Sequence, residues 1–199
     1  RASGRVIDLV NDLLDLDRMK AGKLVLEMTH VQVSAIVEIA IETLEVFANQ
    51  KQVALIDKTH DATLLADQAR IAQVLTNLVS NAVKFSAPGQ TVEISNQIEA
   101  DFCELRVTDQ GPGIAPEYTE VIFQQFKQLP GDQAKAGSGL GLAICREIVE
   151  CHQGEIGVRS QKGQGSTFWF KLPCLATTPR PVSSEPSRAG REAEYNSAT

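Results

Sequence analysis

Three glycines in six residues mark the stretch Gly137-Ser138-Gly139-Leu140-Gly141-Leu142. It runs straight into an amphipathic pattern over Ala143–His152, which predicts a glycine-rich loop that opens a helix. Glycine lets a backbone approach a ligand closely, and the unpaired N–H groups at a helix N-terminus attract anions. The same stretch also fits a plain tight turn, so the residues upstream have to decide whether it holds a phosphate.

Composition limits the classes of protein to which the chain can belong. Its 199 residues are 43% hydrophobic and 22% charged, which predicts one globular domain of ordinary size with some appendage. The net charge of −6 disfavours a nucleic-acid-binding protein. The sequence has no apolar run of about 18 residues, so we expect no membrane segment. Its four cysteines form no CxxC pair, which favours a reducing, cytoplasmic setting over a disulfide framework.

Three regions differ in their pattern. Residues 5–20 carry apolar side chains at helical spacing, and Gly22 ends that pattern. An isolated helix of this length cannot bury such a stripe, so it must pack on the following domain or pair with another helix. Residues 24–173 alternate helical and strand patterns. From Cys174 onward the chain is rich in Thr, Pro, Ser, Arg, Glu and Ala, which predicts a disordered tail.

The middle region predicts a two-layer α/β sandwich, in which a mixed, mostly antiparallel sheet carries helices on one face. Turn signals between successive strand patterns predict two hairpins. The expected helices are Val33–Gln50, Asp67–Phe85 and Gly139–His152, and the expected strands are Val53–Lys58, Thr91–Glu99, Phe102–Thr108, Glu155–Arg159 and Ser166–Leu172.

The expected helix Asp67–Phe85 carries a polar stripe. Its members are Gln73, Asn77, Asn81 and Lys84. Their spacing of i, i+4, i+8 and i+11 puts all four on one face. Asparagine is a poor helix former, and solvated helix faces usually carry Glu, Lys or Gln instead. The stripe therefore fits either an ordinary solvated face or amide oxygens placed for a hard cation, with Lys84 nearby for a phosphate.

A second motif, Asp109-Gln110-Gly111-Pro112-Gly113-Ile114, follows the expected strand Phe102–Thr108. The strand delivers Asp109 to a turn in which Gly111 and Gly113 let a flat ligand approach the backbone. A carboxylate at that point can accept a hydrogen bond from an exocyclic amine such as that of adenine. Taken alone, the motif is more often a simple turn at the end of a strand.

Together these motifs resemble the catalytic and ATP-binding domain of sensor histidine kinases, whose fold is shared with heat-shock chaperone ATPases, type II topoisomerases and mismatch-repair ATPases. The resemblance covers about residues 1–173. It rests on four boxes in order: Asn77-x-x-x-Asn81, Asp109-x-Gly111-x-Gly113, Phe123-x-x-Phe126 and Gly137-x-Gly139-x-Gly141. Residues 6–24 resemble the end of the second dimerisation helix of these kinases, and residues 163–168 resemble their last hairpin.

The resemblance implies three parts of the chain. Residues 1–28 would be the end of the dimerisation helix with its linker, residues 29–173 the ATP-binding catalytic domain, and residues 174–199 the tail. It also implies ATP and Mg²⁺ as ligands. Asn81 would coordinate Mg²⁺ with Asn77 supporting it, and Lys84 would reach the phosphates.

The remaining boxes would hold the nucleotide itself. Asp109 would bind the adenine amine. The base pocket would be lined by Gly111, Gly113 and Thr167, and the triphosphate would be wrapped by Gly137, Gly139, Leu140, Gly141 and Leu142. Residues 127–138 would form a mobile lid, with the two phenylalanines of the third box anchoring its start. Because Gln124-Gln125 lies between them, where many relatives carry charged residues, Lys127 or Lys135 would have to serve the γ-phosphate.

The chain lacks the phosphoacceptor motif of such kinases, which is a histidine followed by an acidic residue and later Arg-Thr-Pro. Its histidines are His30, His60 and His152, and each is expected to be structural or on the surface. His152 would end a helix, where a protonated imidazole suits the helix dipole. The resemblance therefore implies a protein histidine kinase whose acceptor histidine lies outside this sequence, so that the chain alone would not phosphorylate itself.

The implied partners are a dimerisation helix with the acceptor histidine and the receiver domain of a response regulator. The parent protein would be a homodimeric phosphoprotein of two-component signal transduction, with or without a membrane anchor. Two other classes stay open at this point. One is a nucleotide-binding pseudokinase or interaction module. The other is an ATPase of the chaperone or repair branch, or a serine kinase of the same fold, which would need a catalytic Glu where this chain has Gln73.

Overall fold

The computed structural model describes residues 25–128 and 139–175. Their elements along the chain are β1 (Thr29–Gln32), α2 (Val33–Lys51), β2 (Ala54–Lys58), β3 (Thr63–Ala66), α3 (Gln68–Phe85), β4 (Thr91–Glu99), β5 (Phe102–Asp109), the short 3-10 helices η1 (Pro116–Tyr118) and η2 (Val121–Phe123), α4 (Gly141–Cys151), β6 (Glu155–Ser160) and β7 (Ser166–Leu175).

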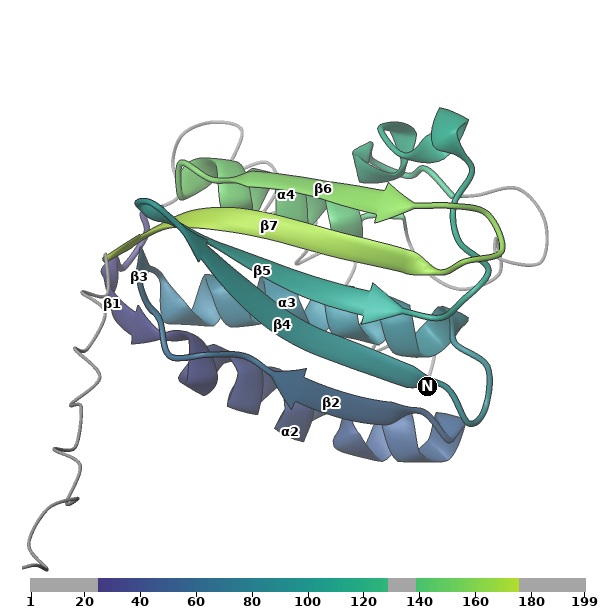
Figure 1. The fold of residues 1–199 in the computed structure, drawn as a ribbon. Coiled ribbons are helices and arrows are strands. Elements are labelled where there is room, and N and C mark those ends of the chain that lie inside the picture. Colours follow the sequence, from purple (N-terminus) through teal and green to yellow (C-terminus); the bar gives the residue numbers. More distant parts are fainter. Residues whose placement is uncertain (1–24, 129–138, 176–199) are drawn as a thin grey trace, which may run out of the picture.

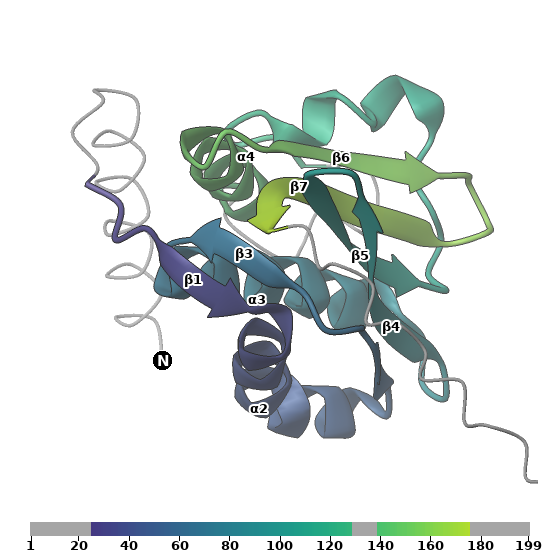
Figure 2. The ribbon, with the colours of Figure 1, turned by 60° about the vertical axis from the view of Figure 1, so that its left-hand side comes forward.

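The strands form one mixed sheet, and α2, α3 and α4 cover a single face of it (Figure 1). The order of the strands is β1-β3-β7-β5-β4-β2, and β6 also pairs with β7. β2 runs parallel to β4, while the other described pairs are antiparallel. Figure 2 shows the same two layers from a second direction. The predicted two-layer α/β sandwich with a mostly antiparallel sheet is confirmed.

β7 is the strand on which the sheet is assembled. One of its edges pairs with β5 over eight positions, from Phe102↔Pro173 to Asp109↔Ser166. Its other edge pairs with two strands in succession. β6 pairs with Ser166–Lys171, and β3 pairs with Cys174 and Leu175. Among the described residues β6 pairs with no other strand, so it forms an outer edge of the sheet.

The core lies between the sheet and the helices. Along β7, Phe168, Phe170 and Leu172 are buried, whereas Trp169 and Lys171 alternate with them onto the open face. The helix α3 supplies the facing layer, with Asp67 as its N-cap, since the Asp67 carboxylate accepts a hydrogen bond from the Arg70 N–H. Its predicted apolar face is buried throughout: Ile71, Val74, Leu75, Leu78, Val79 and Ala82.

The structure has two strands that the sequence pattern did not predict, β1 and β3. Each is only four residues long, which leaves too little alternation to stand out. Other differences concern the ends of elements. The helix α4 begins at Gly141 rather than Gly139, and β7 runs to Leu175, past the domain boundary that we expected at residue 173.

Several predictions fall outside the described residues. They are the dimerisation helix and most of its linker, the tail beyond residue 175, Gly137, and residues 129–138 of the expected lid. Within the described parts of the chain, no helix is long and apolar enough to cross a membrane.

A buried carboxylate organises the open face of the sheet. The Glu104 side chain is only 2% exposed because cationic side chains from three strands close over it. Arg106 Nε donates to its Oε1 at 2.6 Å, Arg159 donates to both oxygens at 2.8 and 3.2 Å, and Lys171 Nζ lies 3.3 Å from Oε2. Burial alone would raise the pKa of Glu104, but these hydrogen bonds outweigh it and lower the pKa to about 2.

We expect Glu104→Gln to lower the free energy of unfolding by about 2 kcal/mol near pH 7, because it leaves three cations without their anion. A carboxyl whose pKa is lowered by folding stabilises the protein above its unfolded pKa and loses that contribution as the pH falls through the folded value. The difference between wild type and variant should therefore shrink as the pH falls from about 4.5 toward about 2. Urea unfolding at a series of pH values measures it.

The matched control is Glu93→Gln, whose carboxylate pairs with Lys58 on the surface at 2.5 Å. Exposed ion pairs of this kind are worth at most about 1 kcal/mol, so this variant should remain close to wild type. An equal loss in both variants, or a Glu104 effect that does not change with pH, would contradict the assignment.

Candidate functional site

Three elements converge at the polar stripe of α3. They are α3 itself, the turn after β5, where a Cβ added to Gly111 would lie 2.8 Å from the Phe85 carbonyl oxygen, and the first residue of α4, Gly141. A Cβ added to Gly141 would lie 3.9 Å from Asn77 Cγ, so the backbone at the start of α4 faces the amide stripe with little between them. The unpaired N–H groups of a helix N-terminus thus lie beside the amides of α3, as an anion site with a cation partner requires.

The amides of the stripe are neither core residues nor freely solvated ones. Asn77 and Asn81 are both half-buried, on the side of α3 next to its apolar face. Asn77 hydrogen-bonds the thiol of Cys145 on α4, which also lies 3.8 Å from the carbonyl of Val74. Burial is the main cause that raises the pKa of Cys145 to about 12, so this thiol stays protonated and acts as a packing group.

Lys84 extends the stripe toward the end of α3. It is half-buried, and its Nζ lies 4.8 Å from the centroid of the neighbouring Phe85 ring. Burial lowers the pKa of Lys84 from its ordinary value. A partly desolvated ammonium at this position interacts more strongly with an anion than a solvated surface lysine does.

Asp109 ends β5 as a buried carboxylate, 6% exposed. Its Oδ1 accepts a hydrogen bond from the Gly111 N–H at 2.8 Å, and the side chain also accepts from the backbone N–H of Ser166. Burial raises the pKa of Asp109, and these two hydrogen bonds oppose the rise. The backbone of two turns therefore holds the carboxylate in one orientation. A carboxylate with a fixed orientation can accept a hydrogen bond from a specific donor group of a ligand.

The turn after Asp109 is held against the hairpin turn between β6 and β7. Gly113, at φ +67°, leaves no room for a side chain, because an added Cβ would lie 2.1 Å from the carbonyl oxygen of Gln161. Gly165, at φ +84°, approaches the Asp109 carbonyl oxygen equally closely. The sequence singled out Gly113, and the structure adds the reason, which is turn-to-turn contact.

Ser160 links these two turns, and no local pattern in the sequence pointed to it. The Ile114 N–H donates to Ser160 Oγ at 2.8 Å, and the hydroxyl in turn donates to the Gly165 carbonyl at 2.8 Å. Nearby, Thr167 Oγ1 lies 3.1 Å from Thr108 Oγ1, which places the predicted Thr167 next to the last residues of β5.

The two phenylalanines of the third box have different roles. Phe123 is buried and packs edge-on against Phe168, with ring centroids 6.5 Å apart. Phe126 is 58% exposed, and its N–H donates to the Gly139 carbonyl at 2.9 Å. Phe123 is therefore fixed through its side chain, and Phe126 is fixed through its main chain to the residue just before Leu140.

Leu140 and Leu142, the two leucines of the glycine-rich stretch, differ in how deeply their side chains are buried. Leu140 is fully buried beneath the start of α4, whereas Leu142 is half-buried against the core. Leu140 therefore positions the loop by packing, and the backbone around it is the part that a ligand can meet.

His152 is not the protonated imidazole that its place at a helix end predicted. The ring is 1% exposed, its Nε2 accepts the Asp67 N–H at 3.0 Å, and its Nδ1 donates to the Ile148 carbonyl at 2.7 Å. Burial is the main cause that lowers the pKa of His152, so the neutral form prevails. Its structural role, linking the end of α4 to the start of α3, agrees with the prediction.

These residues fit a nucleotide with a hard divalent cation. The amide oxygens of α3 are acceptable ligands for such a cation, Lys84 supplies a positive charge, and the start of α4 supplies backbone donors. The glycine at position 141 keeps the space beside Asn77 clear of a side chain. The buried, oriented Asp109 supplies a single acceptor for a base amine.

Comparison with known proteins shows the family to which the chain is similar. Residues 66–176 match the family of histidine kinase-, DNA gyrase B- and HSP90-like ATPases. The sensor-like histidine kinase SenX3 of Mycobacterium tuberculosis is 39% identical over 178 residues, which cover 87% of this chain and 43% of that protein. The circadian input-output histidine kinase CikA of Synechococcus elongatus is 36% identical over 191 residues, 92% of this chain and 25% of that protein.

Solved structures give the same result. Full-length ShkA in complex with AMPPNP superposes with a TM-score of 0.77 at 31% identity, covering 87% of this chain and 37% of that one. The catalytic domain of the histidine kinase ThkA superposes with a TM-score of 0.66 at 30% identity, covering 74% of this chain and 96% of that one. The chain thus spans less than half of SenX3 and CikA, but nearly the whole of an isolated kinase catalytic domain.

We expect Ser160→Ala to lower the free energy of unfolding by about 1–2 kcal/mol, because it leaves the Ile114 N–H and the Gly165 carbonyl without their shared partner. Hydrogen exchange should also quicken at the amides of Gly111, Gly113 and Ile114 before those of β5 are affected. Ser95→Ala is the control, since Ser95 lies on the open face of β4 and the described residues offer its hydroxyl no hydrogen bond. Unchanged exchange at residues 111–114 would show that Ser160 does not hold the turn.

Proposed function

This chain belongs to the family of histidine kinase-, DNA gyrase B- and HSP90-like ATPases, and we propose that it is the ATP-binding catalytic part of a sensor histidine kinase. One observation carries the proposal: the amide of Asn77 on α3 faces the backbone at the start of α4. A phosphate chain at that helix N-terminus would meet the amide stripe and its lysine from one side and backbone donors from the other.

The base end of the nucleotide is assigned to the opposite side of the stripe. Asp109 would accept the adenine amine with its carboxylate, whose Oδ1 also accepts the Gly111 N–H. Gly111 and Gly113 would form the wall of the base pocket, and Thr167 would lie behind it next to Thr108. This assignment uses an acceptor rather than a donor at the base, which favours adenine over guanine, since guanine presents a carbonyl at the corresponding position.

The phosphate end is assigned to α3 and the glycine loop. Asn81 would coordinate Mg²⁺ and Asn77 would support it, while Lys84 would contact the phosphates. The backbone from Gly139 to Leu142, with Gly137 before it, would wrap the triphosphate. Mg²⁺, when bound, would neutralise charge on the phosphate oxygens.

In phosphoryl transfer this chain would position the nucleotide and neutralise charge on its phosphates, and it would form no covalent intermediate. The Lys84 ammonium would stabilise negative charge on the phosphoryl group that is transferred. Asp109 would fix the base, so that the phosphates of the nucleotide extend toward the start of α4. The attacking imidazole would come from a dimerisation helix outside the described residues, and the phosphate would pass from that histidine to an aspartate on a receiver domain.

The two other classes that the sequence left open are less favoured. The curated relatives named above are histidine kinases, and so are the solved neighbours. The position at which the ATPase branch needs a carboxylate base holds Gln73, whose amide oxygen accepts a hydrogen bond from Arg70 at 3.2 Å. An amide is too weak a base to take a proton from water, so hydrolysis is not the proposed reaction.

We expect Asn81→Asp and Asp109→Asn each to weaken binding of AMPPNP with Mg²⁺ by about 100-fold or more, roughly 2.7 kcal/mol, in titration calorimetry. The first change puts a negative charge beside the phosphates. The second allows an amide N–H₂ to face the adenine amine, where two donors would meet.

Matched controls are Asn49→Asp on the exposed face of α2 and Asp101→Asn in the turn between β4 and β5. Both should bind the nucleotide like the wild type. If the two site variants keep the wild-type affinity while remaining folded by circular dichroism, the site assignment fails.

Transfer itself is tested by incubating the chain with labelled ATP and a separately supplied dimerisation helix that bears the acceptor histidine. We expect an acid-labile phosphate on that histidine, and no label when the histidine is replaced by alanine. Release of free phosphate alone would support an ATPase instead, and the absence of both products would support a binding module.

A further inference from the structure

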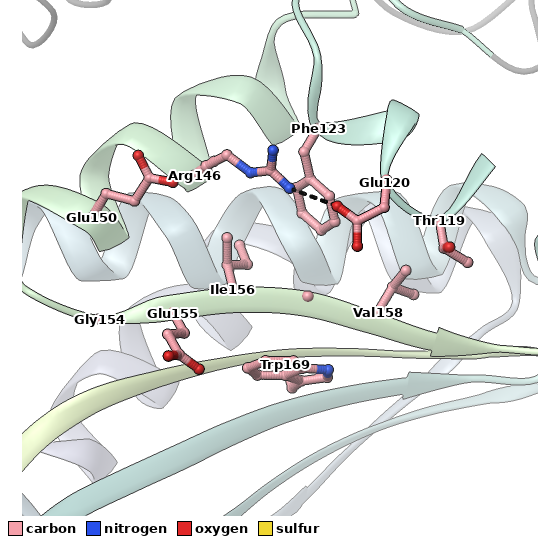
Figure 3. Close-up of a pocket in the computed structure, with 11 residues that line it drawn as sticks. Thr119, Glu120, Phe123, Arg146, Glu150, Gly154, Glu155, Ile156, Val158 and Trp169 are labelled. Carbon is pink, nitrogen blue, oxygen red and sulfur yellow. Dashed lines mark ion pairs between the residues drawn. The ribbon is translucent and has the colours of Figure 1, made fainter. Parts of the chain in front are cut away.

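A groove of about 360 Å³ runs along the outer edge of β6, beneath α4 and the η1–η2 segment (Figure 3). Ile156 and Val158 point up from β6 into it, and Phe123 and Arg146 close it from above. The indole of Trp169 lies below the strand. None of the residues assigned to the nucleotide lines this groove.

The groove lies on the opposite side of α4 from the nucleotide residues. Cys145 points from α4 toward Val74 and Asn77 on α3. The next residue, Arg146, and Glu150 one turn later line the groove instead. A molecule bound in the groove therefore leaves the nucleotide side of α4 free.

The edge of β6 offers hydrogen-bonding groups to a new strand. In an antiparallel pair every second residue directs its N–H and C=O away from the partner. β6 pairs with β7 from Glu155 to Ser160, and within the described part of the chain no backbone group outside β7 bonds to the backbone of this strand. The strand carries no proline, which is a common means of blocking an exposed edge.

The middle of the groove is apolar because the Trp169 indole packs against Gly157 there. A Cβ added to Gly157 would lie 2.5 Å from the Trp169 ring, so only glycine allows the indole to reach the strand edge. The ring is held there by Arg159 and Lys171, which lie 5.0 and 5.7 Å from its centroid. Aromatic surface fixed beside an open strand edge suits the side chains of an added strand.

The two ends of the groove differ in charge. At one end Glu120 pairs with Arg146 at 3.8 Å, and Arg146 also lies 4.7 Å from the Phe123 ring centroid, so its charge is already matched. At the other end Glu150 and Glu155 are exposed, and neither forms an ion pair with a described residue. They flank the C-terminal end of α4, where the helix dipole adds further negative potential. This end attracts a cation.

We propose that the β6 groove binds an extended, basic segment of a partner protein, which adds to the sheet as a strand beside β6. Its Lys or Arg side chain pairs with Glu150 and Glu155, and its apolar side chain covers Ile156 and Val158. Main-chain hydrogen bonds supply affinity, and the acidic end fixes the direction and register of the segment. The partner and a nucleotide can be held at the same time, on the two sides of α4.

The probe is an end-blocked peptide of six alternating lysines and valines, titrated into the full chain and followed by the backbone amide signals in NMR spectra. We expect a dissociation constant on the order of 100 µM, as suits a small interface. The shifted amides should be those of β6 and not those of β1, the edge strand beyond β3. The same peptide with glutamate in place of lysine should not bind.

Two charge variants and one matched control locate the acidic end. Glu150→Lys and Glu155→Lys should each lower the affinity for the lysine peptide by about tenfold, because the new lysine repels the lysines of the peptide. Glu147→Lys makes the same change on the same helix at a residue that does not line the groove, so it should keep the wild-type affinity. All three variants are first checked for an unchanged amide spectrum.

A further peptide tests the strand pairing. Methylation of alternate backbone nitrogens removes the donors that would face β6, and should weaken binding by about tenfold or more. The proposal is overturned if the lysine peptide fails to bind, if the methylated peptide binds equally well, or if Glu147→Lys matches the effect of the two groove variants. Shifts confined to β1 or to the nucleotide residues overturn it as well.

Discussion

The close approach of two turns holds the candidate site in shape. Gly113 and Gly165 let the turn after β5 and the turn between β6 and β7 meet with no side chain between them. Ser160 fastens the contact, and the carboxylate of Asp109 receives a backbone N–H from each side. Burial raises the pKa of Asp109 and these two hydrogen bonds oppose the rise, so the same contact orients the carboxylate and stabilises its charged form.

Whether the sequence predicted a residue of the site depends on how far along the chain that residue's partners lie. The stripe from Gln73 to Lys84 lies on one long helix with a strong 3.6-residue period, and Asp109 stands directly after a clear strand, so both were visible in the sequence. Ser160 acts on an amide 46 residues away, and His152 on one 85 residues away, so nothing local distinguishes them. For the same reason His152 was expected to be protonated, because its burial comes from distant parts of the chain.

The helix α4 contributes residues both to the proposed nucleotide site and to the groove along β6. Its start faces the amide stripe, Cys145 packs toward α3, and Arg146 and Glu150 face the groove along β6. Phe123 contacts Arg146 on the groove side and lies three residues before Phe126, whose N–H is bonded to Gly139. One rigid element thus separates a proposed nucleotide site from a proposed docking groove, and both depend on its packing against β7 and α3.

The most direct test of the central claim is a crystal structure of the 199-residue chain with AMPPNP and Mg²⁺. We expect the adenine amine within hydrogen-bond distance of the Asp109 carboxylate and the triphosphate at the start of α4, with the metal on Asn81. A nucleotide found in the β6 groove, or one with its base away from Asp109, would contradict the account.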